Sequence, residues 1–599
     1  TLSSSSAASD VYKRQVKITP AHDPNDSEVG NRHDLERIQV IDFDDTMINV
    51  PPQFAGLKSA DARKRVLAAL QAAELLRGES EIEHAVGHCY KCGSVIQPLI
   101  KDQWFLKMEP LAKAAKEAIE AKQVTFYPEA RGKQLLQYLD NIRDWNLSRQ
   151  IPWGIPIPAF QNVADPNDWI FDERVDEPRI TVNGKEYRRE EDTFDTWFTS
   201  GQWPFITTDY LDGGELSRFY PNAVMETGHD ILFPWVSRMI MLGLKMTGKV
   251  PFKDVYLHGL VLDEHGQKMS KSKGNVINPI ETLSEYGSDA LRLGLVAARS
   301  AGQNQAFSTT KVVAGRNFCN KLWNIARFIE DKLGENYRFA PPQPQTLADH
   351  WIMRELLGAA EQVEQLLADY RFAEASETVY HTVWSSLADW YIEASKQQDN
   401  PDMLAWALDT ALRLSHPFAP FVTETIWQTL PWYEKGSMLI TAAWPESAEY
   451  DDIAAAEFER VQQLVTEIRF VTSELPGSKK YDVAYHSDSL VADNADLIAK
   501  LARLSSVTQT DQPRGLRLAN SGREAWLVID EATLYEHQTN LEVRLSEAKL
   551  RLENLAARLS NERYVLKAPT ELVEASRKEA LETKELIERL ENELKVISD

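Results

Sequence analysis

From residue 541 to its end, the chain repeats apolar side chains at intervals of three and four residues. The first run has the spacing four, three, four, three, four, through Leu541, Leu545, Ala548, Leu552, Leu555 and Leu559. A second run continues the spacing through Val573, Ser576, Ala580, Thr583, Ile587, Leu590, Leu594 and Ile597. A stripe of this kind is buried only against another helix, so the two runs predict an antiparallel coiled-coil hairpin over 536–599.

The rest of the chain is too long for a single core, because one core rarely serves more than about 250–300 residues. We therefore expect a multidomain protein. The expected parts are a foreign or disordered tail (1–15), the end of a domain (16–50), a mixed α/β domain (51–300) with a small insertion (161–190), a helical bundle (301–450), a mixed linker domain (451–535) and the hairpin (536–599).

Local patterns predict individual elements of these parts. Asn183-Gly184 favours a tight hairpin turn within 179–188, and Asn278-Pro279 favours a helix start. In the bundle, Leu356, Ala360, Val363 and Leu367 lie at helical spacing. Further expected elements are helices at 60–76 and 111–121, strands at 94–100, 255–262, 481–485 and 525–529, and a strand, turn, helix and strand within 16–50.

Composition limits the function classes. The chain has 66 Lys and Arg against 90 Asp and Glu, a formal net charge of -24. This acidity disfavours a nucleic-acid partner without excluding one, because binding needs only a local basic surface. Three cysteines in 599 residues exclude a disulfide framework and are typical of a reducing cytosol, so a cytoplasmic protein is expected. No apolar run is long enough to predict a membrane helix.

The most specific motif is the loop Lys268-Met269-Ser270-Lys271-Ser272-Lys273-Gly274-Asn275. It follows an expected strand and carries three ammonium groups and two hydroxyls. Such groups surround phosphate oxygens and donate hydrogen bonds to them, so the loop can close over a triphosphate. A generic lysine cluster would more often be an ordinary solvated loop.

The loop resembles the Lys-Met-Ser-Lys-Ser signature of class I aminoacyl-tRNA synthetases. The resemblance implies an α/β Rossmann-like catalytic domain, here incomplete, and a helical anticodon-binding bundle. It also implies that Lys271, supported by Lys268, contacts charge that develops on the leaving pyrophosphate, with Ser270 and Ser272 beside the nucleotide. ATP and the Mg²⁺ bound with it are the implied cofactors.

A second segment, Glu226-Thr227-Gly228-His229-Asp230, resembles the nucleoside-binding segment of the same synthetases. Glycine allows close backbone approach to a ligand, and a carboxylate can hold ribose hydroxyls or an ammonium group. The resemblance therefore assigns Glu226, Gly228, His229 and Asp230 to the aminoacyl-adenylate site. A polar helix start is the simpler reading of the residues alone.

Segments 144–150 and 195–200 also resemble this subclass, which comprises valine, isoleucine and leucine enzymes. The family usually has Cys where Asn146 stands. Segment 16–26 and the C-terminal hairpin resemble valyl enzymes in particular. The resemblance implies a valine–tRNA ligase that acts as a monomer on valine, ATP and tRNA(Val).

In valyl enzymes the segment at 16–26 belongs to an editing domain. A pocket for valine rejects threonine only weakly, a limit for which valyl enzymes are themselves a standard example, so a second, hydrolytic site is needed. The resemblance assigns Lys17, Thr19, Asp23 and Asp26 to it. A structural strand followed by an Asx turn is the alternative.

The resemblance begins near residue 16, and the chain contains no His-Ile-Gly-His motif. We therefore expect N-terminal truncation, with the first halves of the nucleotide-binding fold and the editing domain missing. Cys89 and Cys92 form only half of a zinc site and the third cysteine, Cys319, is distant, so no metal site is predicted and zinc stays open.

Three other functions remain open. An isoleucyl synthetase shares the catalytic motifs but more often ends in a cysteine-rich zinc module. A non-catalytic, synthetase-derived tRNA-binding protein is consistent with the missing signature, although it has little use for a phosphate-binding loop. A coiled-coil scaffold accounts for residues 541–599 but leaves the lysine loop unexplained.

Overall fold

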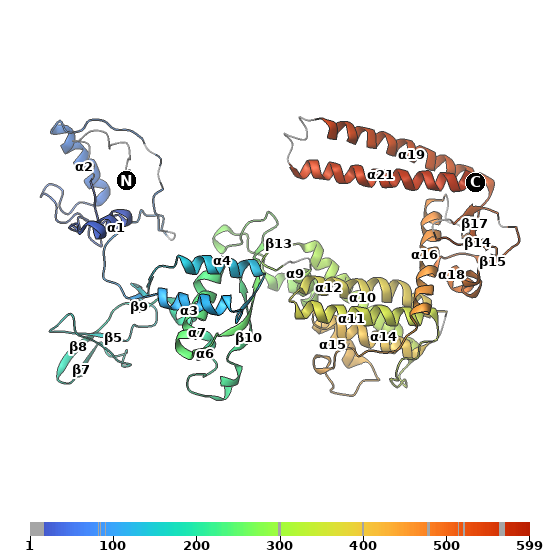
Figure 1. Cartoon of the computed structure of the whole chain (residues 1–599), viewed down its shortest axis with the longest axis horizontal. Helices are drawn as coiled ribbons and strands as arrows, with labels where there is room; N and C mark the ends of the chain where they lie inside the picture. The colour runs from blue at the N-terminus through green and yellow to red at the C-terminus, as the bar shows by residue number, and fades with distance from the viewer. Residues whose placement is uncertain are drawn as a thin grey trace. The chain divides into compact units, whose positions relative to one another are not determined.

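The computed structural model describes residues 17–598 except 82, 84, 90–91, 298–300, 398–399, 476–479, 513, 519–520 and 562–569. The tail expected at 1–15 lies outside the described residues. The chain divides into two compact units (Figure 1). One comprises 1–117, 138–217 and 238–249, and the other 118–137, 218–237 and 250–599.

The elements follow one another in a mixed order up to residue 306 and are mainly helical afterwards. The first are α1 (Pro24–His33), α2 (Ser59–Ala72), β1 (Phe105–Leu106), α3 (Glu109–Glu120), β2 (Thr125–Tyr127), α4 (Glu129–Asp140), β3 (Trp145–Asn146), β4 (Ser148–Arg149), β5 (Ala159–Asn162), β6 (Trp169–Phe171), β7 (Arg179–Val182), β8 (Lys185–Arg189), β9 (Thr193–Phe194), α5 (Thr196–Ser200) and α6 (Trp203–Ile206). Next come η3 (Glu215–Phe219), β10 (Asn222–Gly228), η4 (His229–Ile231), η5 (Leu232–Val236), α7 (Ser237–Thr247), β11 (Phe252–His258), β12 (Val261–Leu262), η6 (Lys271–Lys273), α8 (Pro279–Tyr286), α9 (Ser288–Val296) and β13 (Gln305–Ala306).

The remaining elements are mostly long helices. They are α10 (Thr309–Leu333), α11 (Leu347–Ala368), α12 (Phe372–His381), η7 (Thr382–Tyr391), α13 (Ile392–Ser395), α14 (Pro401–Ser415), α15 (Pro420–Thr429), η8 (Leu439–Thr441), α16 (Asp452–Glu474), β14 (Asp482–Tyr485), α17 (Ser489–Asp493), α18 (Ala495–Leu501), β15 (Ser506–Gln509), β16 (Leu516–Arg517), β17 (Ala525–Val528), α19 (Glu531–Ser560) and α21 (Thr570–Ser598).

In the first unit, a small antiparallel sheet has the strand order β6–β5–β8–β7. Asn183 and Gly184 connect β7 to β8, and both have positive φ angles, 50° and 78°. Positive φ at both central residues suits the right-handed twist of a hairpin, so the predicted turn is confirmed. Phe160, Ile180 and Tyr187 form the buried core of this sheet.

Two predicted strands are absent from the described residues. Residues 94–100 contribute only the bridge between His88 and Val95. Between 17 and 50 the chain forms α1 but no strand, and residues 41 and 47 meet in an isolated bridge. These short apolar runs have no neighbouring strand with which to pair, so apolar alternation alone was insufficient. The predicted helices at 60–76 and 111–121 are present as α2 and α3.

The second unit contains a three-stranded parallel sheet with the order β10–β11–β2. The predicted strand at 255–262 is interrupted after His258. Residues Val261 and Leu262 form the separate β12, which pairs with β13. The predicted helix start is confirmed, because Asn278 caps α8 by accepting a hydrogen bond from the Ile280 amide at 3.0 Å.

The helices after residue 309 share one large core with the segment that follows them. Trp351 of α11 and Phe458 of α16 are both almost fully buried, with ring centroids 5.1 Å apart. The same core includes Val483 of β14 and Leu527 of β17. The predicted strands at 481–485 and 525–529 are therefore present, in a sheet of order β15–β14–β17–β16.

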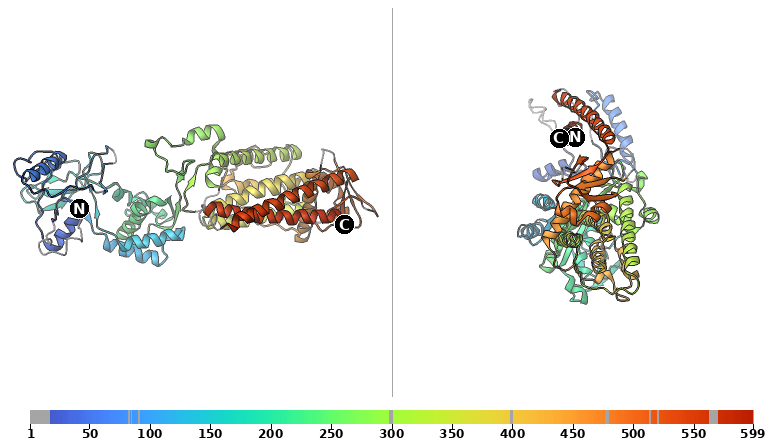
Figure 2. Two further views of the ribbon diagram at one scale, coloured as in Figure 1. Left: turned by 90° about the horizontal axis from the view of Figure 1, so that it is seen from above. Right: turned by 90° about the vertical axis from the view of Figure 1, so that its right-hand side faces the viewer.

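The two last helices, α19 and α21, run side by side in opposite directions (Figures 1 and 2). Their seam contains Leu541, Ala548, Ile587 and Leu590. Lys549 Nζ also lies 2.7 Å from the Glu591 carboxylate across it. Among the described residues, no helix combines the length and the apolar character needed to cross a membrane.

Candidate active site

The nucleoside-binding candidates occupy the carboxyl end of β10 in the second unit. Glu226, Thr227 and Gly228 are its last residues, and Gly228 lies opposite His258, the last residue of β11. The His258 ring donates a hydrogen bond through Nδ1 to the Glu226 carboxylate. A carboxylate and an imidazole therefore stand together where two parallel strands end, which is where open α/β sheets bind their ligands.

Gly259 permits a close backbone approach at this point. A Cβ atom there would lie 1.6 Å from the carbonyl oxygen of Gln303. The next residue of that segment, Asn304, accepts hydrogen bonds at 2.8 Å from the Leu260 amide and at 2.8 Å from His229 Nε2. Gly259 and Asn304 thus hold His229 in place. The sequence analysis missed both, because nothing local marks a contact between segments 44 residues apart.

The lysine loop is attached to the same strand ends. Lys268 Nζ lies 3.2 Å from the Asp230 carboxylate. Both side chains are partly exposed, so the pair itself contributes at most about 1 kcal/mol of stability. Its consequence is positional, because it brings the start of the loop beside the residues that follow β10.

A buried carboxylate closes the base of the loop. Asp263 accepts hydrogen bonds from Asn275 Nδ2 at 2.8 Å and from the amides of Gln267 at 2.7 Å and His265 at 3.0 Å. The Asn275 hydrogen bond, followed by the Gln267 amide, lowers the pKa of Asp263 below its usual value. Asn275 also accepts from the Ser270 amide at 2.9 Å. Asp263 and Asn275 therefore join the two ends of the loop.

Between these ends, Lys271 and Lys273 are exposed and belong to the single 3-10 turn η6. The turn ends at Gly274, whose positive φ of 68° is a left-handed conformation that favours glycine. Ser272 lies in the same turn, and its side chain is outside the described residues. The structure thus brings Lys268 to Asp230 and leaves Lys271 exposed on the loop.

A second polar cluster in the first unit surrounds the buried Asp195, which caps α5. Its carboxylate accepts hydrogen bonds from the Trp145 indole at 2.9 Å and from Arg149 at 2.7 Å. The guanidinium of Arg238 stacks over the Trp145 ring at 3.7 Å. Desolvation lowers the pKa of Arg238 below its usual value. The two segments that resemble the subclass, 144–150 and 195–200, are therefore in direct contact.

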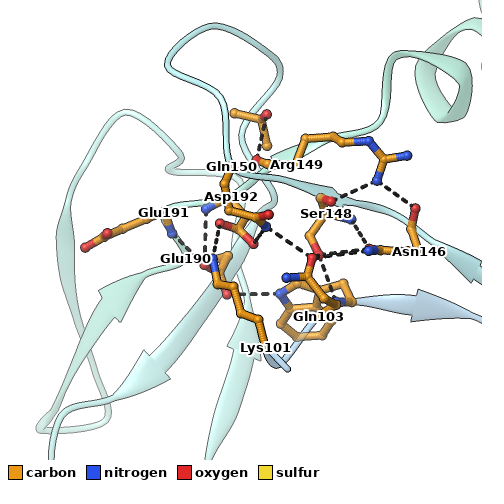
Figure 3. A network of polar contacts seen from close by, with 11 residues as sticks. Lys101, Gln103, Asn146, Ser148, Arg149, Gln150, Glu190, Glu191 and Asp192 are labelled. Carbon is orange, nitrogen blue, oxygen red and sulfur yellow. Dashed lines mark hydrogen bonds and ion pairs between the residues drawn. The ribbon is translucent and has the colours of Figure 1, made fainter. Parts of the chain in front are cut away.

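Asn146 belongs to an adjoining network (Figure 3). Its side-chain amide donates to Gln103 Oε1 at 3.3 Å, and its oxygen accepts from the Ser148 amide at 3.1 Å. Ser148 Oγ also donates to Gln103 at 2.7 Å. Asparagine uses a donor and an acceptor here simultaneously. This explains how the position is filled in this chain, where the family usually has Cys.

The editing candidates meet at the start of the described chain. Thr19 donates to the Asp26 carboxylate through its amide at 2.8 Å and through its hydroxyl at 3.1 Å. Lys17 Nζ donates to the Thr19 hydroxyl at 3.3 Å. Asp23 caps α1 by accepting from the amides of Asn25 and Asp26, at 2.8 Å and 3.0 Å. Lys17, Thr19 and Asp26 are therefore clustered, while Asp23 has a clear structural role.

The Cys-x-x-Cys pair lies on a tight turn. The Gly93 amide donates to the Cys89 carbonyl at 2.8 Å, and the Cys92 thiol contacts Ser94 Oγ at 3.3 Å. The contacts with Ser94 lower the pKa of Cys92 to about 7. Within the part of the chain that the structure describes, no group of three or more His, Cys, Asp or Glu side chains is placed to hold a metal ion.

Comparison with known proteins places these sites in a family. The model for "tRNA synthetases class I (I, L, M and V)" matches residues 11–308, and the model for "Anticodon-binding domain of tRNA ligase" matches 349–484. With the lysine loop at the strand ends, these matches define a class I aminoacyl-tRNA synthetase with an anticodon-binding domain, which confirms that part of the predicted resemblance.

Individual relatives identify the amino acid. The chain is 37% identical over 609 residues to the valine–tRNA ligase of Petrotoga mobilis, covering 97% of this chain and 69% of that protein. It is 38% identical over 592 residues to that of Geobacillus stearothermophilus, covering 94% and 66%. For Carboxydothermus hydrogenoformans the values are 37% over 587 residues, 94% and 66%. The chain belongs to the valine–tRNA ligase family, and it spans about two thirds of the length of these relatives.

Proposed function

We propose that the protein activates valine with ATP and transfers the valyl group to tRNA(Val). Family membership supports the reaction, and one contact supports its location. The Lys268–Asp230 pair brings a loop with three ammonium groups to the carboxyl end of β10 in a parallel sheet. We infer that this sheet is part of a Rossmann-like nucleotide-binding fold, with the nucleotide at those strand ends.

In the proposed reaction, the carboxylate of valine attacks the α-phosphorus of ATP, and pyrophosphate leaves. Negative charge builds on the leaving oxygens, so a preorganised cation there lowers the barrier. Lys271, exposed on η6, is the group that we assign to this charge, and Lys268 positions the loop. Mg²⁺ bound with ATP supplies further charge neutralisation. Glu226 and His258 stand on the ribose or amino-acid side of the site.

The cluster of Lys17, Thr19 and Asp26 supports a second activity, hydrolysis of threonyl-tRNA. It gathers an ammonium, a hydroxyl and a carboxylate in one place. Such groups can hold the hydroxyl and ammonium of threonine, which the valine pocket discriminates only weakly. Asp23 serves this site indirectly, because it fixes the first turn of α1 on which Asp26 lies.

We further infer that α19 and α21 form a coiled-coil arm that contacts tRNA. Of the cations first considered for this contact, Arg551 is already engaged, because its Nε lies 2.9 Å from Glu579 of the other helix. Arg563 lies outside the described residues. The arm therefore depends on other side chains, or on its shape, for any contact with RNA.

The test of the reaction is amino-acid-dependent ATP–pyrophosphate exchange by the protein expressed from its complete reading frame. Valine should support exchange at least about tenfold faster than isoleucine or leucine at equal concentration. A hydrophobic pocket distinguishes one methylene by roughly 1–3 kcal/mol, so this margin is within its reach. A preference for isoleucine would reject the valine assignment, and no exchange with any amino acid would favour a non-catalytic RNA-binding protein.

A further inference from the structure

A basic cleft lies where the helical bundle meets the mixed segment after it. It has a volume of about 810 Å³ and is bordered by α10, η7, α16 and α18. Five cationic side chains line it: Lys321, Arg469, Lys480, Lys500 and Arg503. Such a concentration is unexpected in a chain whose net charge is -24. Because all the lining elements belong to the second unit, the cleft is formed within one compact body.

The two carboxylates of the cleft are already paired. Asp389 lies 2.9 Å from Lys321 Nζ, and Glu393 lies 2.5 Å from Lys396 Nζ. Among the described residues, no ion pair or hydrogen bond from a carboxylate reaches the side chains of Lys480, Lys500 or Arg503. The cleft thus keeps an excess of positive charge that the protein itself does not neutralise.

Two arginines approach each other in the cleft. Arg469 donates through Nε and Nη2 to the Leu501 carbonyl, at 2.9 Å and 2.7 Å, at the end of α18. It also lies over the Trp390 ring at 4.9 Å. Desolvation, and next the positive charge of Arg503, lower the pKa of Arg469. Two guanidinium groups that repel each other are favoured together only when an anion lies near both.

The backbone at Arg503 is also unusual. Its φ is 57°, in the left-handed region, and the Leu504 amide donates to the Ala499 carbonyl to close α18. Glycine is the residue that helix ends normally place in this conformation, because a Cβ is unfavourable there. The attraction of a helix C-terminus for cations could account for Lys500 and Arg503. It does not account for Arg469 or Lys480, which lie outside α18.

We propose that this cleft binds backbone phosphates of tRNA, through Arg469, Lys480, Lys500 and Arg503. The proposal rests on the proposed function and adds the surface that holds the RNA. A phosphodiester backbone presents repeated anions at a spacing that several cations can share, which a single small anion does not. Arginine also suits phosphate better than other cations do, because its planar fork donates two parallel hydrogen bonds. An RNA segment here would touch both the bundle and the mixed segment.

The test compares tRNA(Val) binding by the protein and by the double variant Lys500→Gln/Arg503→Gly, followed by fluorescence anisotropy over a salt series. Each lost phosphate contact should reduce the slope of log K against log salt by about 0.7–0.9. The affinity should fall about tenfold for each lost cation. Lys113→Gln, an exposed lysine on α3 in the other unit, should change neither quantity. Valine-dependent pyrophosphate exchange should stay unchanged in all variants.

The single variant Arg503→Gly separates a binding role from a structural one. Glycine relieves the left-handed backbone, so its Tm should rise while its affinity for tRNA falls. A fall in both Tm and affinity would indicate that Arg503 only supports the fold, and would overturn its assignment.

The remaining outcomes distinguish this proposal from the proposed function. If the unaltered protein bound tRNA and the double variant bound it equally well, with the same salt slope, the cleft would not be an RNA site. If the unaltered protein did not bind tRNA at all, the proposed function itself would fail. If inorganic phosphate alone raised the Tm through Lys500 while tRNA binding stayed unchanged, the cleft would be a small-anion site and the proposal would be overturned.

Discussion

At the scale of single residues, the lysine loop separates positioning from catalysis. Lys268 is held by Asp230, whereas Lys271 is exposed on η6. If Lys271 meets charge that appears only in the transition state, Lys271→Ala should slow valine-dependent pyrophosphate exchange about a hundredfold or more and leave the KM for valine nearly unchanged. Lys253→Ala, an exposed lysine on β11, serves as the matched control and should have no effect. A rise in KM alone would assign Lys271 to ground-state binding.

The base of the loop is a second residue-scale device. Asp263 holds Asn275 and two backbone amides, so Asp263→Ala leaves donors without a partner and frees the loop. We expect the exchange rate to fall roughly tenfold or more, since an inaccurately positioned catalytic group loses much of its effect. The loss should not add to that of Lys271→Ala, because both variants remove the same contact. Full additivity in this double-mutant cycle of exchange rates would show that Asp263 acts elsewhere.

Gly259 gives a stability prediction at the same scale. A Cβ atom would lie 1.6 Å from a carbonyl oxygen, so the backbone must move in Gly259→Ala. Overpacking of this kind costs about 1–3 kcal/mol, and it should release the segment that carries Asn304. Amide hydrogen exchange of residues 302–306 should therefore accelerate. Gly358→Ala, on an exposed face of α11 with no atom near the added Cβ, should instead be neutral or slightly stabilising. Unchanged exchange in Gly259→Ala would contradict the close approach.

The residues that sequence could identify were those whose chemistry is local. The lysine loop and the turn at Asn183-Gly184 carry their signal in consecutive residues. The roles of Gly259, Asn304 and His258 depend on segments brought together by parallel pairing, which leaves no local pattern. The assignments of Lys271, Ser270, Glu226 and the editing residues to ligands remain predictions, because geometry alone does not test a ligand contact.

At the scale of elements, burial explains which predictions held. Helical periodicity over α10 and α11 was reliable because one face of each is buried in the bundle core. Short apolar runs were less reliable. Residues 94–100 have the apolar character of a strand but lack a partner, and 255–262 is divided at Gly259 so that its last residues pair with β13. Strand formation depends on a distant partner, which apolar content does not specify.

The paired helices α19 and α21 give the element-scale prediction. Ending the chain at Arg544 removes most of the pair but keeps the contact of Arg544 with Glu474 of α16, at 2.7 Å. If the pair is an arm for tRNA, this truncation should raise the KM for tRNA in aminoacylation about tenfold and leave valine-dependent pyrophosphate exchange intact. The salt dependence of tRNA binding should become shallower only if the arm contributes phosphate contacts. An unchanged KM for tRNA would make the pair an assembly or stability element.

At the scale of the whole molecule, the large core crosses the boundary that the sequence suggested near residue 450. Phe458 of α16 is completely buried, and its ring packs against Trp351 of α11. The bundle and the following mixed segment should therefore lose structure together. Composition changes near 450, from dense helical periodicity to a mixture of helix and strand. It does not reveal whether the two sides bury surface against each other.

Phe458→Ala tests this cooperation in the intact chain. Removing a buried Phe side chain costs about 3–5 kcal/mol through lost burial and the cavity left behind. If one core serves both segments, amide hydrogen exchange should accelerate in α11 and in β14 by the same factor, because both are then exposed by one opening event. Phe421→Ala, whose side chain is 61% exposed, should leave both unchanged. Acceleration confined to β14 would mean that the bundle is stable by itself, and the basic cleft between the segments could then open without unfolding the bundle.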